Sequence, residues 1–243
     1  MNYSQRNEGT FDISGSQAGA QVLSRTFLAS VFSWMFMGLL ATAGMAWVFA
    51  DNASLMRLLV SETGMTPLGW IVMLSPLGFV LLMSFGFQKL SSMVLMLLFI
   101  AFSVIMGMSL SFIFLVYDLG SIATTFVITA GMFGVMALLG YTTKTDLSRF
   151  GSIMIMGLVG IIIASFVNML MHSPTMSYVI SFLGVLIFTG LTAYDVQKLK
   201  RIGMHVESGT ESSNKLVIMG ALTLYLDFIN LFLFLLRFLG NRR

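Results

Sequence analysis

Seven long apolar stretches constrain this chain of 243 residues more than any other feature of its sequence. Each is close to the roughly 20 residues that an α-helix needs to cross the hydrocarbon core of a bilayer. The pattern therefore predicts an all-α membrane protein with seven transmembrane helices. The link between the second and third stretches is so short that these two helices must form an antiparallel hairpin. The predicted spans are 27–50, 68–87, 91–116, 121–141, 151–171, 176–196 and 216–239.

The composition is that of an integral membrane protein. Apolar residues make up 57% of the chain and charged residues 9%, which lies far outside the range of soluble domains. The absence of cysteine excludes disulfides, thiolate catalysis and cysteine-ligated metals. The polar segment 1–25 has little to bury, so we expect a mobile cytoplasmic tail ahead of a single transmembrane domain, 26–243. A signal peptide would place a basic head directly before a short apolar core, so we expect the first span to be retained.

The basic residues in the links predict the orientation. With a cytoplasmic amino terminus, nine of the 13 Lys and Arg residues lie inside, which the positive-inside rule favours. The carboxyl terminus is then periplasmic. An even number of crossings is the alternative, because three of the four outside residues fall in the last seven. The inside set is Arg6, Arg25, Lys89, Lys144, Arg149, Lys198, Lys200, Arg201 and Lys215, and the outside set is Arg57, Arg237, Arg242 and Arg243.

Two aspartates are the candidate working residues. Asp227 interrupts the last apolar stretch, where a charged carboxylate costs about 2.5 to 3.5 kcal/mol, so it should face the protein interior and find a partner. Asp195, in the last turn of the preceding stretch, is the nearest candidate. Thr223 and Asn230 share a helix face with Asp227, and Thr192 lies on the face of Asp195. We expect these two polar stripes to face each other across neighbouring antiparallel helices.

Two carboxylates brought close together cannot both ionise cheaply, so the pair is expected to share one proton. When ionised, the same pair is a weak, transient site for Ca²⁺, which takes oxygen ligands. Two alternatives stay open: Asp195 pairs with Lys198 or Lys200 at the interface, and Asp227 makes only a structural hydrogen bond. Lys89 is a candidate latch that reaches the pair, although such a lysine more often extends to the headgroups.

Other chemistry is weakly supported. His172 and His205 fall in different links with no ligand spacing around them, so a zinc site is not expected. We expect no tightly bound cofactor, no nucleic-acid partner and no enzymatic activity. A remote alternative is an intramembrane aspartyl protease, but Leu224-Tyr225-Leu226 precedes Asp227 where that group has Gly-x-Gly.

Three motifs resemble those of the Bax inhibitor family, and the resemblance extends from Arg25 to the end of the chain. They are Gly140-Tyr-Thr-Thr-Lys-Thr-Asp-Leu-Ser, Tyr194-Asp195 and Leu224-Tyr-Leu-Asp-Phe-Ile-Asn-Leu-Phe. The chain looks closest to the branch found in bacterial inner membranes. The resemblance implies six helices wrapped around a central seventh. It also implies a pH-sensitive calcium leak whose sensor is an aspartate pair matching Asp195 and Asp227.

Two further expectations come from the same resemblance. Family members can carry a basic latch near the end of the second helix, which this chain reduces to Gln88-Lys89. The resemblance also points to a related bacterial branch that is associated with restraining a membrane-bound quality-control protease. The alternative function is therefore an interaction protein that modulates such a protease or other membrane proteins. The expected partners are the lipid bilayer, Ca²⁺ and protons, and in the alternative also a membrane protein.

Overall fold

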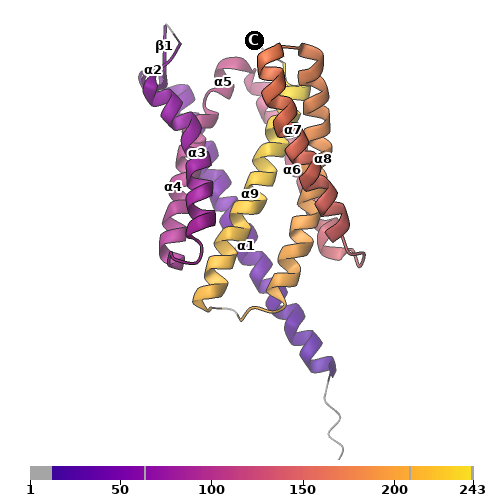
Figure 1. Ribbon diagram of the computed structural model, residues 1–243. Helices are drawn as coiled ribbons and strands as arrows, with labels where there is room; N and C mark the ends of the chain where they lie inside the picture. The colour runs from indigo at the N-terminus through magenta and orange to yellow at the C-terminus, as the bar shows by residue number, and fades with distance from the viewer. Residues whose placement is uncertain (1–12, 63, 208, 242–243) are drawn as a thin grey trace, which may run out of the picture.

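The computed structural model describes residues 13–62, 64–207 and 209–241, and only the backbone of residues 13–18 and 20. The described chain is a bundle of long helices (Figure 1). The elements are α1 (Ile13–Asp51), α2 (Ala53–Leu59), β1 (Val60–Ser61), β2 (Gly64–Met65), α3 (Pro67–Gly86), α4 (Ser92–Leu110), α5 (Ile113–Val116), α6 (Leu119–Thr142), α7 (Ser148–Met171), α8 (Pro174–Gly203) and α9 (Glu211–Leu239).

Seven helices in the described part of the chain are long and apolar enough to cross a membrane, which confirms the predicted fold class. They are α1, α3, α4, α6, α7, α8 and α9. α3 and α4 pack against each other around the short turn at 87–91, as the predicted hairpin requires. α1 begins at Ile13, within the segment expected to be a mobile tail, and residues 1–12 of that tail lie outside the described part.

Short polar side chains fix where several helices begin. The hydroxyl groups of Thr66, Ser91, Ser173 and Thr210 each accept a hydrogen bond from the backbone N–H three residues further on. Such caps satisfy N–H groups that the first helical turn leaves without partners, and each is worth about 1 kcal/mol. Thr66 and Ser173 precede prolines at the first helical position, where the missing N–H costs nothing. These caps set the depth at which α3, α4, α8 and α9 enter the bundle.

α9 is the most deeply buried of the long helices. In its most apolar stretch 67% of the residues are buried, against 6% for α7. It packs against α1, α4, α6 and α8, and Leu224, Tyr225 and Leu231 are fully enclosed. α3 packs mainly on α4, and α7 on α8. α9 is therefore the core helix of the bundle, while the arrangement of all six other helices around it stays a prediction.

Glycines let α6 and α7 approach α8 closely. A Cβ at Gly140 would clash with the carbonyl oxygen of Ala193, and a Cβ at Gly151 would clash with the ring of Tyr194. Both contacts lie within two residues of Asp195. The backbone next to that aspartate is therefore in close contact with both α6 and α7, which limits how far its carboxyl group can move.

Candidate functional site: an aspartate pair between two helices

The structure brings together the carboxyl groups of Asp195 on α8 and Asp227 on α9. Their side chains lie close enough to interact directly. Both residues are buried, with exposed fractions of 9% and 5%. A carboxylate only accepts hydrogen bonds, so a bond between two carboxyl groups needs a proton on one of them. The geometry therefore suits the sharing of one proton, which stays a prediction.

One carboxyl oxygen of Asp227 lacks a hydrogen-bond donor. Its Oδ2 atom is the one buried side-chain oxygen or nitrogen, among the residues that the structure describes, without a conventional hydrogen-bond partner. Burying an ionised oxygen without a donor is costly in an apolar interior. The alternative is that Asp227 makes only a structural hydrogen bond to a backbone group. Within the described residues Asp227 has no such bond to support it.

Both helices of the pair are longer than the predicted spans. α8 continues eight residues past Asp195 to Gly203, so this aspartate, in the last turn of the apolar stretch, lies two turns inside its helix. α9 begins at Glu211, five residues before the predicted start. Polar residues outside the apolar stretches continue both helices, which hydropathy alone cannot reveal. α9 also crosses the bundle obliquely (Figure 1).

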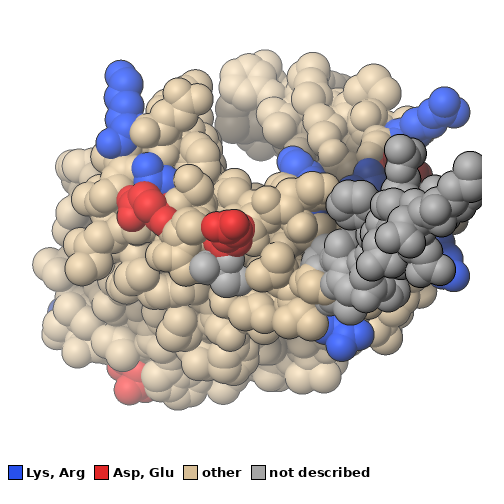
Figure 2. All heavy atoms as spheres, turned by 90° about the horizontal axis from the view of Figure 1, so that it is seen from below, with Lys and Arg blue, Asp and Glu red and all other residues tan. Residues whose placement is uncertain are grey.

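Both aspartates line a cavity of about 770 Å³ whose walls come from α3, α4, α7, α8 and α9. Thr223 and Asn230 line it as well, and each bonds a carbonyl oxygen of its own helix, at 3.0 and 2.8 Å. Thr192 does not line the cavity and instead donates to the carbonyl of Phe188. Two of the three predicted supporting residues therefore share the cavity with the pair. Figure 2 shows the molecule hollowed at one edge of the end where α8 ends and α9 begins.

The lysine nearest the pair is not the one that sequence reasoning favoured. Lys89 lies exposed in the turn between α3 and α4 and is not among the cavity-lining residues, whereas Lys198 lines the cavity one turn from Asp195. No ion pair within 4.0 Å joins either Lys198 or Lys200 to Asp195 in the described part of the chain. Lys200 donates instead to the carbonyl of Tyr141, at 2.7 Å. The structure therefore gives no support to a simple interfacial Asp–Lys pair.

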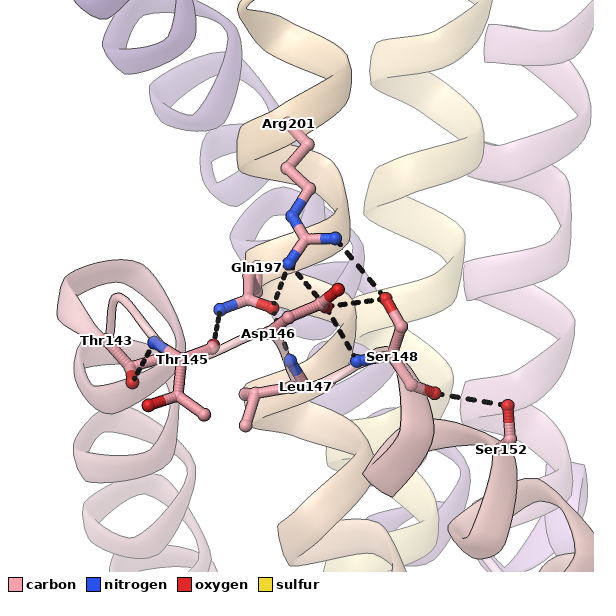
Figure 3. A network of polar contacts seen from close by, with 8 residues as sticks. All are labelled: Thr143, Thr145, Asp146, Leu147, Ser148, Ser152, Gln197 and Arg201. Carbon is pink, nitrogen blue, oxygen red and sulfur yellow. Dashed lines mark hydrogen bonds and ion pairs between the residues drawn. The ribbon is translucent and has the colours of Figure 1, made fainter.

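A polar clamp holds the end of α8 against the link between α6 and α7 (Figure 3). The Gln197 side chain donates to the carbonyl of Thr145 at 2.8 Å and accepts from the N–H of Leu147 at 2.9 Å. Arg201 Nη2 contacts Asp146 Oδ1 at 2.6 Å. Hydrogen bonds from Arg201 and Ser148 hold the pKa of Asp146 well below its ordinary value. We call these three side chains, Gln197, Arg201 and Asp146, the α8 clamp. The clamp begins two residues after Asp195.

Tyr225 fixes the rotation of α9. Its hydroxyl group lies 2.6 Å from Thr42 Oγ1, which itself donates to the carbonyl of Ser103 at 2.8 Å, so Tyr225 is the donor. Its ring meets those of Phe99 and Phe102 edge to face. Tyr225 and Asp227 are about 200° apart around the helix axis, so anchoring one directs the other toward α8. Sequence reasoning missed this role, although a tyrosine hydroxyl in an apolar helix is itself a signal, because it needs a partner.

The described residues contain no group of three or more His, Cys, Asp or Glu side chains placed to hold a metal ion. The pair would therefore supply the only two carboxylates of a calcium site here. Ca²⁺ takes six to eight oxygen ligands, so water and carbonyl groups would have to provide most of them. Such a site suits passage of the ion rather than storage.

The fold and site together define a class: a multi-pass, all-α membrane protein with an acidic pair inside its helical bundle. A family model described as inhibitor of apoptosis-promoting Bax1 matches residues 24–243. The chain therefore belongs to the Bax inhibitor-1 family, as its motifs predicted.

Relatives from distant bacteria cover almost the whole chain. Inner membrane protein YbhL of Escherichia coli is 49% identical over 220 residues, which cover 90% of this chain and 93% of that protein. A protein of Borreliella burgdorferi is 46% identical over 222 residues, covering 91% and 94% of the two chains. A protein of Rickettsia prowazekii is 42% identical over 219 residues, covering 90% and 91%.

Proposed function

We propose that this protein is a pH-sensitive calcium leak of the bacterial inner membrane, gated by proton sharing between Asp195 and Asp227. One observation carries the proposal: two buried carboxyl groups on adjacent helices lie close enough to interact and line the same cavity of the bundle. Ionisable groups inside a membrane bundle are costly, and they mark ion or proton pathways more often than packing sites.

The mechanism follows from the charge of the pair. With one proton shared, the carboxyl groups stay together, α9 is held against α8 and the path is closed. When a rise in pH removes that proton, two unit charges about 4 Å apart repel by roughly 4 kcal/mol at an effective dielectric near 20. That energy is enough to shift a two-state element whose states differ by a few kcal/mol. The separated carboxylates then offer oxygen ligands to an entering cation.

Location and orientation are part of the same proposal. The name of the Escherichia coli relative places that protein in the inner membrane, which supports the same location here. We propose a cytoplasmic amino terminus and a periplasmic carboxyl terminus. The links at 87–91, 143–147 and 204–210 then lie inside, and Lys and Arg side chains are spread over that end of the molecule (Figure 2).

Calcium flux from liposomes tests the proposal. We expect Asp195→Asn and Asp227→Asn each to abolish the rise in flux with pH, because neither variant can form a doubly charged pair. Asp51→Asn makes the same chemical change at an exposed acid outside the cavity and should keep the parent's pH profile. If both pair variants also kept that profile, the gating mechanism would be wrong.

The alternative is a non-enzymatic interaction protein that modulates a membrane protease or other membrane partners. It makes the opposite prediction for the aspartates. Copurification of a partner would survive both Asn substitutions and would depend on the tail or on the segment 198–215.

Lys89 as a latch also stays a prediction. Lys198→Gln and Lys89→Gln, measured side by side in the flux assay, would show which lysine affects gating.

A further inference from the structure

A second hollow region lies on another side of α9, between α1 and α6. Three adjoining hollows form one groove, because neighbouring hollows share lining residues: Phe32 and Ala137 at one junction, Leu39 and Phe126 at the next. α1 and α6 each pack on α8 and α9 but have no extensive contact with each other. Phe228 of α9 forms part of the floor. We call this feature the α1–α6 groove.

The groove is long, narrow and apolar. Its middle hollow has a volume of about 450 Å³, within the roughly 300 to 1,000 Å³ of small-ligand sites. Arg25 and Leu39 both line it and are about 21 Å apart along α1 at 1.5 Å per residue. One leaflet of the hydrocarbon core is about 15 Å thick. The groove is therefore long enough for a complete acyl chain that starts at Arg25.

The middle hollow is slender. It extends along α1 from Phe32 to Ala43, about 16 Å at 1.5 Å per residue, with a volume of about 450 Å³. A single hydrocarbon chain suits such a slot better than an α-helix, which is about 10 to 12 Å across with its side chains. We therefore take lipid as the occupant.

The charge at one end of the groove selects the headgroup. Arg25 and Tyr141 line this end, and the ammonium group of Lys200 lies 4.8 Å from the centre of the Tyr141 ring. Arg25 makes no ion pair within 4.0 Å in the described part of the chain. No carboxylate is among the described residues that line the three hollows. An anionic phosphate at this end would therefore meet uncompensated positive charge.

We propose that the α1–α6 groove binds an anionic phospholipid, with one acyl chain lying in the groove and the phosphate at Arg25. The bound chain packs against Phe228, the neighbour of Asp227 in sequence. The lipid therefore supports α9 from the side that the aspartate cavity leaves free. The assignment of this site does not rest on the proposed leak, because no residue of the aspartate pair takes part in it.

Two glycines of α6 provide a matched test of the chain-binding part. Gly134 lines the groove and Gly131 does not, and a Cβ at either position would meet nothing within 4 Å. We expect Gly134→Phe to fill the groove and to lower retention of dioleoyl phosphatidylglycerol in native mass spectrometry of the full chain. Gly131→Phe, the same change one turn away, should leave retention at the parent level.

The headgroup is tested in the same measurement. We expect dioleoyl phosphatidylglycerol to be retained better than dioleoyl phosphatidylcholine, and Arg25→Gln to weaken retention of the anionic lipid about five-fold. Arg149→Gln removes an exposed charge on α7 that does not line the groove and is the control. Equal retention of the two lipids by the parent, or of the anionic lipid by both glycine variants, would overturn the proposal, since either result indicates unselective surrounding lipid.

Direct labelling keeps the test decisive if a variant fails to fold. Phosphatidylglycerol carrying a photoreactive diazirine in its acyl chain should label peptides from the facing sides of α1 and α6 in the unmodified chain. An excess of unlabelled phosphatidylglycerol should remove that labelling, and the same excess of phosphatidylcholine should not. Labelling spread evenly over α3 and α7, whose exposed apolar faces meet bulk lipid, would overturn the assignment.

Discussion

The hydroxyl group of Tyr225 is a polar atom in a place where only apolar atoms would be expected. The side chain is fully enclosed, and its hydrogen bond to Thr42 links α9 to α1, while Thr42 in turn links α1 to α4. Polar bonds between transmembrane helices contribute modestly, in the range of 0.6 to about 2 kcal/mol. Tyr225 therefore matters more for the direction in which α9 faces than for the total stability of the bundle.

Replacement of Tyr225 by Phe tests this interpretation. We expect Tyr225→Phe to lower the free energy of unfolding in mixed micelles by about 1 kcal/mol, because Thr42 loses its donor while the ring packing is kept. Tyr178→Phe removes the same hydroxyl group from an exposed tyrosine of α8 and should have no measurable effect. Equal stability of the two variants would show that the bond does not anchor α9.

Helical periodicity placed Thr223, Asn230 and Asp227 on one face, and all three line the same cavity. It could not identify the contacts that hold this face in position. Thr42 and Tyr225 are separated by 183 positions in the chain, and Gln197 and Thr145 by 52. Such pairs meet only when the helices have packed, and no local pattern in the sequence records them. The aspartates were predictable because an acid in an apolar helix is anomalous by itself.

Among the elements, α1, α8 and α9 differ most from expectation, and α1 begins at Ile13, well before its predicted span. Hydropathy located all seven spans to within a few residues at most ends, because an apolar stretch and the helix that contains it nearly coincide. At the junction of α8 and α9 the helices continue through Lys198, Lys200 and Arg201 on one side, and through Glu211 and Lys215 on the other. The caps and the α8 clamp, rather than lipid, stabilise these polar ends.

The α8 clamp makes a prediction about pH. Since the pKa of Asp146 is lowered in the folded protein, its contribution to stability is complete above the ordinary value near 4 and is lost as pH falls through the folded value. The clamp therefore does not titrate between pH 5 and 8. We expect Asp146→Asn to increase hydrogen exchange of the 143–148 link several-fold at pH 7 while leaving the pH midpoint of calcium flux unchanged.

Asp51→Asn is the control for that experiment. Asp51 is also an exposed acid, but it lies at the carboxyl end of α1 and is not part of the α8 clamp. A shift of the flux midpoint in Asp146→Asn, but not in Asp51→Asn, would contradict the assignment of pH sensing to the buried pair alone. Unchanged exchange in the 143–148 link would show that Gln197 holds the link without the ion pair.

On the scale of the whole molecule, α9 separates two hollow regions of different character. The cavity on one side contains both buried aspartates, and the α1–α6 groove on the other contains none of the described acidic residues. The two regions meet α9 through neighbouring residues, Asp227 and Phe228. A displacement of α9 that opens one region must therefore change the other, which connects the surrounding lipid with the acid pair.

The orientation of the molecule can be measured without interference from native thiols, because the chain has no cysteine. We expect Asn241→Cys, near the carboxyl terminus, to react in spheroplasts with a maleimide that cannot cross membranes. Thr145→Cys, in the link between α6 and α7, should react only after permeabilisation. Both sites are exposed, so a failure to react reports the side of the membrane rather than burial. The reverse pattern would overturn the proposed orientation.

The core position of α9 has a consequence for biosynthesis. Helices leave the ribosome in chain order, so six spans enter the membrane before the helix on which four of them pack has been made. Until then the inner faces of α1, α4, α6 and α8 can meet only lipid or one another. Maturation of the bundle is therefore a late event, completed by its final span, and a nascent chain stopped ahead of that span would present an unfilled centre to the proteases that remove defective membrane proteins.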